Sequence, residues 1–149
     1  MLAGESFVSA PSVLTVMTPF PVHTSADTPV IAAEAIMRGR DVRHLPVERD
    51  GSVIGVVSDA DLRVARVLMD LPEMPVERLC TRPPLVVETD VPVRRLVTRM
   101  AEEGVDAAIV LRQGRLAGIV TLSDICDELL RHMPTPFGQE PPPSGGEAA

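Results

Sequence analysis

Lysine, tryptophan and tyrosine are absent from this chain, and only three of its residues are phenylalanine. With so few aromatic side chains, a core must be built from Val, Leu, Ile, Met and Ala, and a hydrophobic content of 45% is enough to build one. The formal net charge is −7. Because non-specific nucleic-acid binding needs a basic surface, we do not expect nucleic acid as a partner.

Cysteine is scarce and long apolar runs are missing. The two cysteines, Cys80 and Cys126, form neither a C-x-x-C pair nor a ligand spacing with histidine, so we expect inert thiols rather than a metal or redox site. No apolar run approaches the ~18 residues of a membrane span, and the N-terminus lacks the features of a signal peptide. We therefore expect a cytoplasmic protein without a membrane partner.

Features typical of enzymes are also lacking. The chain has no glycine-rich phosphate loop with lysine and no recognisable Ser/His/Asp spacing, and its three histidines lie far apart. The neighbouring carboxylates at residues 59–61 and 124–127 are explained by the electrostatics of helix starts. We therefore predict no catalytic site, no metal site and no required cofactor.

What the chain does contain is an internal repeat with an offset of 63 residues. The sequence Gly-Val-Val-Ser-Asp-Ala-Asp at residues 55–61 returns as Gly-Ile-Val-Thr-Leu-Ser-Asp at residues 118–124. Residues 17–62 align without a gap on residues 80–125, which brings turn glycines, prolines and core valines into register. Such self-similarity indicates two copies of one structural unit.

Each copy has the same pattern of strands and helices. In the first copy we expect a short strand near residues 21–24 and a helix that begins at Asp-Thr-Pro, residues 27–29. A hairpin follows, with a tight turn at Asp50-Gly51, and a second helix at residues 59–69 closes the unit. The second copy repeats this order, from a strand at residues 85–88 to a helix at residues 122–132.

The order strand, helix, strand, strand, helix, given twice, predicts an α+β fold built from two β-α-β-β-α repeats. Neither half is long enough to bury a core comfortably alone, so the two should pack together as one module. We divide the chain into a poorly ordered N-terminus (1–11), a first repeat (12–70), a connector (71–77), a second repeat (78–132) and a disordered Pro/Gly-rich tail (133–149).

Both copies carry a capping box at the start of their second helix, Ser58-x-x-Asp61 and Thr121-x-x-Asp124. One interpretation is purely structural, because these side chains satisfy the first backbone N–H groups of the helix. The other is functional, because a capped helix start offers N–H groups to a phosphate and a carboxylate to ribose hydroxyls. The two interpretations are compatible, and both stay open on these residues alone.

With these features the chain resembles a tandem pair of CBS domains, also called a Bateman module, over residues 12–132. The resemblance rests on Val-Met-Thr-Pro at residues 16–19, Val-Arg-His-Leu-Pro-Val at residues 42–47, and the repeated motif Gly-hydrophobic-hydrophobic-Ser/Thr-x-x-Asp. It implies a pseudo-two-fold axis between the repeats, a flat homodimer, and two clefts for adenosine-containing ligands. The candidate ligands are AMP, ADP, ATP and S-adenosylmethionine.

The resemblance also implies roles for individual side chains. The carboxylates of Asp61 and Asp124 would accept hydrogen bonds from ribose hydroxyls, and the hydroxyls of Ser58 and Thr121 would approach ribose or phosphate. Ser123 would donate to a phosphate.

Three further residues have both a structural and a functional interpretation. Thr28 would face the Asp124 cleft by resemblance, but we favour a cap on the helix that begins at Pro29. Val56 and Ile119 are candidates for contact with the base, and for them we favour packing in the core.

Arg43 and His44 distinguish the first copy from the second. By resemblance, a basic residue just before this strand contacts phosphate, and the second copy has Asp106 in place of Arg43. We therefore predict that the cleft with Asp61 takes AMP, ADP or ATP, and that the cleft with Asp124 is empty or takes a less charged nucleoside. In the alternative, Arg43 is a solvated surface charge and His44 a hydrogen-bonded strand residue. A one-residue shift of register would exchange the faces on which they lie.

These features together predict a non-catalytic regulatory module that binds an adenine nucleotide between its repeats and signals to an effector protein in trans. The first alternative is a protein-interaction scaffold with vestigial nucleotide pockets, which Asp106 favours for the second cleft. A small enzyme that uses the clefts and a nucleic-acid binder are alternatives that the sequence disfavours.

Overall fold

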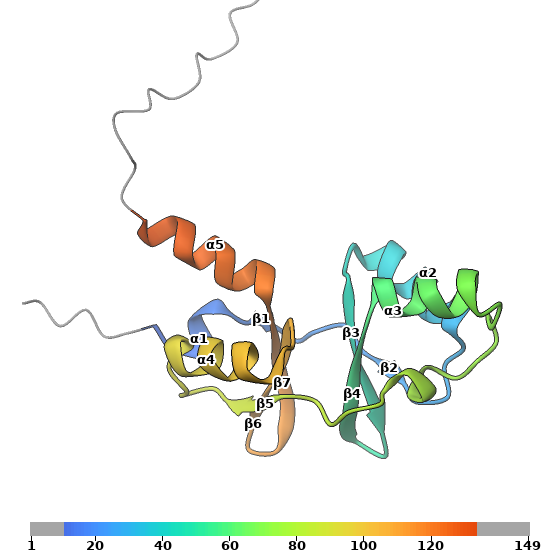
Figure 1. The fold of residues 1–149 in the computed structure, drawn as a ribbon. Helices are drawn as coiled ribbons and strands as arrows, with labels where there is room; N and C mark the ends of the chain where they lie inside the picture. The colour runs from blue at the N-terminus through green and yellow to red at the C-terminus, as the bar shows by residue number, and fades with distance from the viewer. Residues whose placement is uncertain (1–10, 134–149) are drawn as a thin grey trace, which may run out of the picture.

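The computed structural model describes residues 11–133, and Figure 1 shows its helices and strands in two groups that lie side by side. The expectations for residues 1–10 and 134–149 concern parts of the chain outside this range. The first repeat comprises β2 (Thr24–Ser25), α2 (Val30–Arg40), β3 (His44–Arg49), β4 (Ser52–Ser58) and α3 (Asp59–Arg63), which continues as the π-helical turn η1 (Val64–Leu68). The second comprises β5 (Val86–Glu88), α4 (Val93–Glu103), β6 (Ala107–Arg112), β7 (Arg115–Thr121) and α5 (Leu122–His132). The segments that precede them hold α1 (Val13–Val16), β1 (Thr18–Pro19) and the 3₁₀ turn η2 (Val76–Leu79).

Two small sheets carry these repeats, in the orders β2-β3-β4 and β1-β7-β6-β5. Each has a β-α-β unit with parallel strands followed by an antiparallel hairpin, so the predicted α+β class and repeat order are confirmed. The first hairpin turns through Asp50 and Gly51, both with positive φ, as a type I′ turn requires. Gln113 and Gly114 make the matching turn in the second hairpin.

Local details at the start of the first repeat differ from the sequence-based expectation. The first strand is short and begins only at Thr24. Thr28 is not the cap of α2, because the N-cap residue is Pro29 and it makes no side-chain cap hydrogen bond. The Thr28 hydroxyl instead accepts from Thr24 at 2.9 Å. The physical reason lies in the connector: the N–H groups of Val30 and Ile31 donate to connector carbonyls, both at 2.9 Å, so no side-chain cap is needed.

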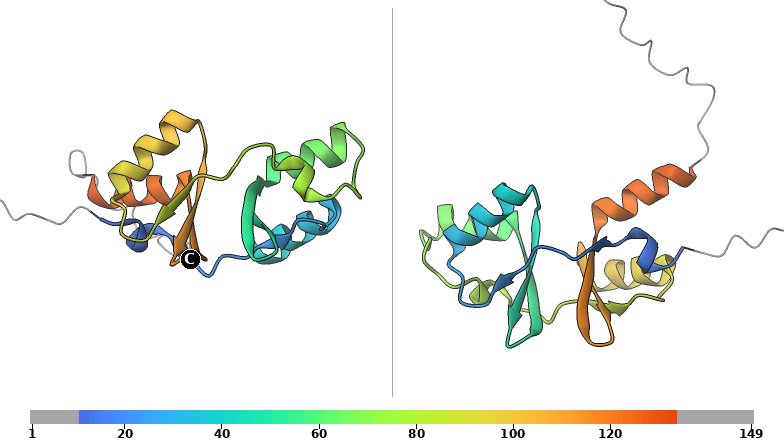
Figure 2. Two further views of the ribbon diagram at one scale, coloured as in Figure 1. Left: turned by 90° about the horizontal axis from the view of Figure 1, so that it is seen from below. Right: turned by 180° about the vertical axis from the view of Figure 1, so that it is seen from behind.

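The leading segment of the chain, residues 11–19, packs on the second repeat rather than on the first. Val13 is fully buried in the core of the second repeat, and its N–H donates to the carbonyl of Val91 at 2.8 Å. β1 extends the sheet of the second repeat by pairing with β7. Figures 1 and 2 show this blue segment beside the orange strands, although the sequence assigned residues 12–19 to the first repeat.

The connector makes the reciprocal crossing. Val76 in η2 is fully buried in the core of the first repeat, and its N–H donates to the carbonyl of Thr28 at 2.9 Å. Each repeat is therefore completed by the segment that precedes the other one. This exchange of segments ties the two halves into one module.

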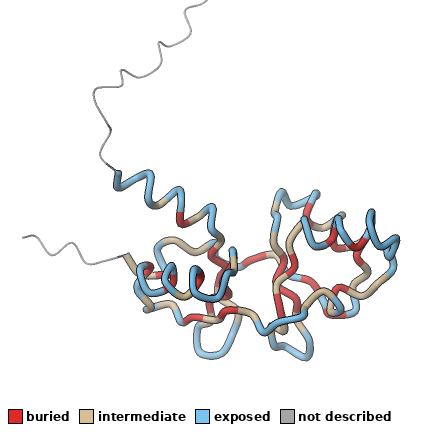
Figure 3. The backbone as a smooth tube through the Cα atoms, viewed as in Figure 1, coloured by how far each residue is buried: buried red, intermediate tan, exposed pale blue. Residues whose placement is uncertain are grey.

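Three clusters of buried side chains form the interior, one within each repeat and one between the sheets. The cluster between the sheets contains Ala107, Ile109 and Ile119, with Val53 and Val56 packed against it. Figure 3 shows buried backbone, coloured red, where the two sheets face each other. Ile119 thus packs in the core as expected. No helix within residues 11–133 is both long and apolar enough to cross a membrane.

Candidate functional site

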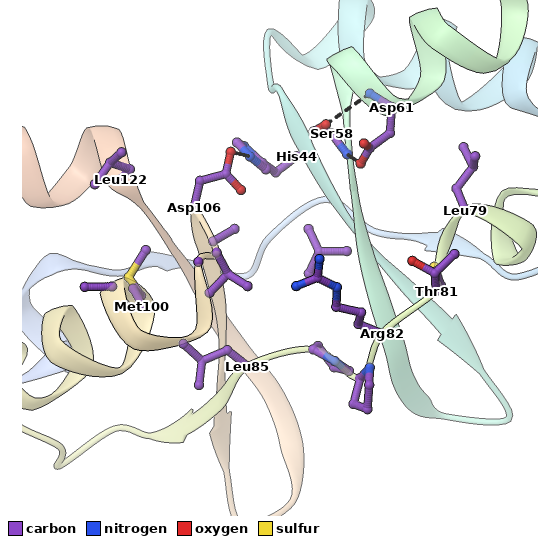
Figure 4. Close-up of a pocket in the computed structure, with 18 of the residues that line it drawn as sticks. His44, Ser58, Asp61, Leu79, Thr81, Arg82, Leu85, Met100, Asp106 and Leu122 are labelled. Atoms are coloured by element: carbon purple, nitrogen blue, oxygen red, sulfur yellow. Dashed lines mark hydrogen bonds and ion pairs between the residues drawn. The ribbon is translucent and has the colours of Figure 1, made fainter.

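A cavity of about 740 Å³ lies between the two repeats (Figure 4). One side belongs to the first repeat and carries His44, Ser58 and Asp61, and the other belongs to the second repeat and includes Asp106. The segment that leads into β5, residues 79–85, runs along the cavity between them. The volume is typical of a site that encloses one small molecule.

Asp61 stands at this cavity because β4 ends there and α3 begins. The Ser58 hydroxyl accepts from the N–H of Asp61 at 3.1 Å, and Asp61 Oδ2 accepts from the N–H of Ser58 at 2.9 Å. The predicted capping box is therefore confirmed. Asp61 Oδ1 takes no part in the cap, and a helix start with a carboxylate beside it is a place where hydroxyl groups and anions bind.

The second capping box forms at the start of α5. Asp124 Oδ2 accepts from the N–H of Thr121 at 2.7 Å and from its hydroxyl at 3.0 Å. The structure does not bring Thr121, Ser123 or Asp124 together with Asp61, because the side chains of α5 that line the shared cavity are those of Leu122 and Ile125. Thr28 does not line this cavity either, and its carbonyl accepts from the N–H of Val76 in the connector.

Arg43 and His44 lie on different faces, as adjacent residues at the start of a strand must. His44 begins β3 and lines the cavity with Asp61. Arg43 lies in a separate groove between α2 and α3. The structure therefore does not bring Arg43 together with Asp61, and of this pair only His44 is placed to meet a ligand in the cavity.

Asp106 comes from the second repeat and lies beside His44, with its Oδ2 3.3 Å from His44 Nε2. Repeat register alone had assigned this carboxylate to the cleft with Asp124. It lines the cavity with Asp61 instead, because the end of α4 and the start of β6 face the first repeat there. The cavity thus holds two carboxylates, which weakens the expectation that it attracts a highly charged phosphate chain.

Arg82 is the functional candidate that the sequence analysis missed. It comes from the segment before β5, and Figure 4 shows its guanidinium in the space between the two repeats, below His44. Arginine offers a fixed positive charge and paired donors to a phosphate or another anion. The sequence feature that could have identified it is the single basic residue in Thr-Arg-Pro-Pro at residues 81–84. This feature becomes informative only when the segment is known to pack along the first repeat.

The CBS domain family model matches the chain twice, at residues 13–67 and 76–131. This chain belongs to the CBS domain family. It is 32% identical over 118 residues to a CBS domain-containing protein of Dictyostelium discoideum, an alignment that covers 70% of this chain and 81% of that protein.

Solved structures of CBS domain pairs share the fold. One, in complex with 5′-methylthioadenosine and S-adenosyl-L-methionine, matches with a TM-score of 0.75 at 21% identity, over 83% of this chain and 99% of that one. Another, the CBS domain of a bacterial CNNM/CorC family Mg²⁺ transporter in complex with ATP, matches with a TM-score of 0.70 at 27% identity, over 82% and 89%. These relatives bind adenosine-containing molecules.

Cys80 provides a chemical reporter inside the cavity of this CBS pair. Burial raises the pKa of its thiol above the ordinary value of 9.0, and the charge of Asp61 raises it further. A raised pKa keeps the thiol protonated through neutral pH, and only the thiolate reacts readily. We expect a thiol reagent at pH 7 to modify the exposed Cys126 at least about 10-fold faster than Cys80.

Peptide mapping after timed labelling measures both rates in one sample, and Cys126→Ser isolates the slow reaction. Labelling of Cys80 should accelerate as the pH rises toward its raised pKa. Equal rates for the two thiols at pH 7 would contradict the position of Cys80 in the cavity wall.

Proposed function

We propose that this CBS pair is a regulatory module that binds one adenosine-containing ligand in the cavity between its repeats. The observation that carries the proposal is the meeting of Asp61, at a capped helix start, with Arg82 in a single cavity of about 740 Å³. The relatives that bind ATP, 5′-methylthioadenosine and S-adenosyl-L-methionine support this class of ligand. CBS domain pairs are generally regulatory rather than catalytic, and we propose no reaction for this one.

We assign each side chain of the cavity to the part of the ligand that its chemistry suits. The free oxygen of Asp61 accepts hydrogen bonds from ribose hydroxyls, which a carboxylate does more strongly than a neutral group. Arg82 and His44 meet the group at the 5′ position, and Val56 lies against the base. A ligand held in this way touches both repeats and the segment between them, so it favours whichever relative placement of the repeats offers all these contacts at once.

The charges in the cavity favour a ligand with few negative charges. The cavity is lined by two carboxylates, Asp61 and Asp106, together with one arginine and one histidine. A triphosphate would bring more negative charge than the single arginine, Arg82, can neutralise. Among the candidate ligands, we propose that AMP and S-adenosylmethionine bind more tightly than ATP.

The test is thermal unfolding with AMP, ATP and S-adenosylmethionine for the natural chain, Asp61→Asn and Asp124→Asn. A ligand at about 100 times its Kd adds about 2.7 kcal/mol to the unfolding free energy. Because a hydrogen bond to a charged group is worth about 1.5–3 kcal/mol, Asp61→Asn should weaken binding by about 10- to 100-fold. Asp124→Asn is the matched control, since Asp124 makes the same cap outside the cavity.

Loss of ligand stabilisation in Asp124→Asn alone would place the site at the other helix start. Absence of any response from three folded proteins would overturn the proposal and support the scaffold alternative. Higher affinity for ATP than for AMP would contradict the argument from Asp106 while leaving the site in place.

We propose that ligand binding is reported to an effector protein through the outer helices. We also propose that the module acts as a homodimer. Apolar side chains stay exposed on the outer helical surfaces of both repeats: Val67 and Leu68 on η1, and Leu129, Leu130 and Met133 at the end of α5. Exposed apolar surface of this kind is what a second copy or an effector would cover.

A further inference from the structure

The cavity has two walls of different chemistry. The first repeat contributes the polar groups described above. The second repeat contributes an apolar wall, which we define as Leu85, Val97, Met100, Leu122 and Ile125. Figure 4 shows Leu85, Met100 and Leu122 on the opposite side of the cavity from Ser58 and Asp61. Within this wall, Val97 and Leu122 are 37% and 55% exposed, which is high for apolar side chains that face a cavity.

The fold itself does not require an apolar wall at these positions, because the first repeat has charged residues there. Val97 and Leu122 correspond to Glu34 and Asp59 in the repeat alignment, and Ala101 corresponds to Arg38. These charged residues line the groove between α2 and α3, about 530 Å³ in volume. Ion pairs occupy that groove, Arg66 with Glu34 at 2.5 Å and Arg63 with Asp59 at 3.8 Å.

The placement of α5 opens the apolar wall toward the cavity. In the first repeat, α3 packs against α2. In the second, α5 packs mainly against β7 and α1, and its Ile125 shares a buried cluster with Leu96 and Met100 of α4. The space between α4 and α5 therefore continues into the space beside Asp61 and Arg82, and the two form one cavity.

We propose that the ligand of this cavity is an adenosine-containing molecule that carries a hydrocarbon chain at a singly charged 5′ group, as an acyl adenylate does. This inference rests on the proposed function, which places the ribose on Asp61. The group at the 5′ position meets Arg82 in the middle of the cavity, and the chain continues onto the apolar wall, where ribose and phosphate would find no polar partner. The hydrocarbon chain adds binding energy because it covers the exposed side chains of Val97 and Leu122.

The expected signature is an affinity that rises with chain length. Burial of one methylene group is worth about 0.8 kcal/mol, which is about fourfold in Kd. The probes are 5′-O-(N-acylsulfamoyl)adenosines with acetyl, butanoyl and octanoyl chains, measured by titration calorimetry on the full chain. The sulfamoyl group brings one negative charge and resists hydrolysis. Because Leu122 stays near solvent, burial is partial, and we expect octanoyl to bind about 100-fold tighter than acetyl.

Two variants convert the apolar wall into its first-repeat counterpart, Leu122→Asp and Val97→Glu. Both positions are exposed enough to accept a charge, and aspartate is favourable in the first turn of a helix. Each variant should reduce the ratio of octanoyl to acetyl affinity to below about 10-fold and leave the Kd for acetyl within about threefold. Leu14→Asp is the control, because Leu14 is 45% exposed on α1 and lies outside the cavity.

The outcomes separate this inference from the proposed function. Equal affinity for the acetyl and octanoyl probes overturns the inference that a hydrocarbon chain binds on the apolar wall, and it leaves the proposed adenosine site unaffected. A chain-length effect that persists in both wall variants, or that disappears in Leu14→Asp alone, places the chain elsewhere and also overturns the inference. Failure of all three probes to bind a folded chain that AMP or S-adenosylmethionine still stabilises overturns the inference alone, and failure of these ligands as well overturns both.

Discussion

Replacing Val13 by aspartate is expected to cost more than about 4 kcal/mol of unfolding free energy, the largest effect of any single change considered for this protein. Val13 is 0% exposed and packs among the core side chains of the second repeat. A carboxylate there would lose its water without gaining a partner. Urea denaturation followed by circular dichroism measures the loss. Native-state hydrogen exchange should locate it in β6 and β7, which are far from residue 13 in the sequence.

The neighbouring residue is the control for this change. Leu14 is 45% exposed, so Leu14→Asp places the same charge one residue away in water, and its cost should stay below about 1 kcal/mol. Similar losses in the two variants, or loss of protection in β3 and β4 before β6 and β7, would show that the leading segment does not complete the second repeat.

The second large effect is expected at Gly55 and Gly118, the two glycines that let the crossing segments approach the strands. A Cβ atom on Gly55 would lie 2.6 Å from Cys80 Sγ and 2.7 Å from Cys80 Cβ. A Cβ atom on Gly118 would lie 2.5 Å from Met17 Sδ and 2.9 Å from the carbonyl oxygen of Thr18. Each substitution by alanine should destabilise the protein by about 1–3 kcal/mol, because a backbone segment must move away.

The two variants should differ in ligand binding. Gly55→Ala displaces the segment at Cys80 that borders the cavity, so it should weaken an adenosine ligand by about 10-fold, whereas Gly118→Ala should not. Gly39→Ala is the control for stability. Nothing lies within 4 Å of its Cβ position in α2, so alanine should stabilise the helix by about 0.5–1 kcal/mol. A neutral effect at Gly55 or Gly118 would mean that the crossing segments are not in close contact with the strands.

Much of this fold could be predicted from the sequence because its signals are local. The first hairpin turn follows from Asp-Gly, which favours positive φ angles, and the repeat register places Gln113-Gly114 in the same turn of the second hairpin. The capping boxes follow from a hydroxyl and a carboxylate three residues apart. Repetition strengthened each signal, since the same residues recur 63 positions later in the same role.

What escaped prediction depends on contacts between the copies. A repeat alignment shows which residues are equivalent but not which copy a leading segment packs on, because both choices satisfy the same local pattern. Asp106 was therefore assigned to the wrong cavity, and Arg82 was not recognised at all. The opposite faces of Arg43 and His44 follow from strand geometry, but only the structure shows which of them is turned toward the cavity.

The crossing of the two leading segments also fixes the order in which the protein can be completed during translation. Residues 11–19 leave the ribosome before either repeat, yet β7, with which β1 pairs, follows roughly 100 residues later. At about 5–20 residues per second, this leading segment waits on the order of 5–20 s for the strand with which it pairs. Until then Val13 lacks its core, so a nascent chain that stops before β7 exposes the apolar leading segment that chaperones and proteases recognise.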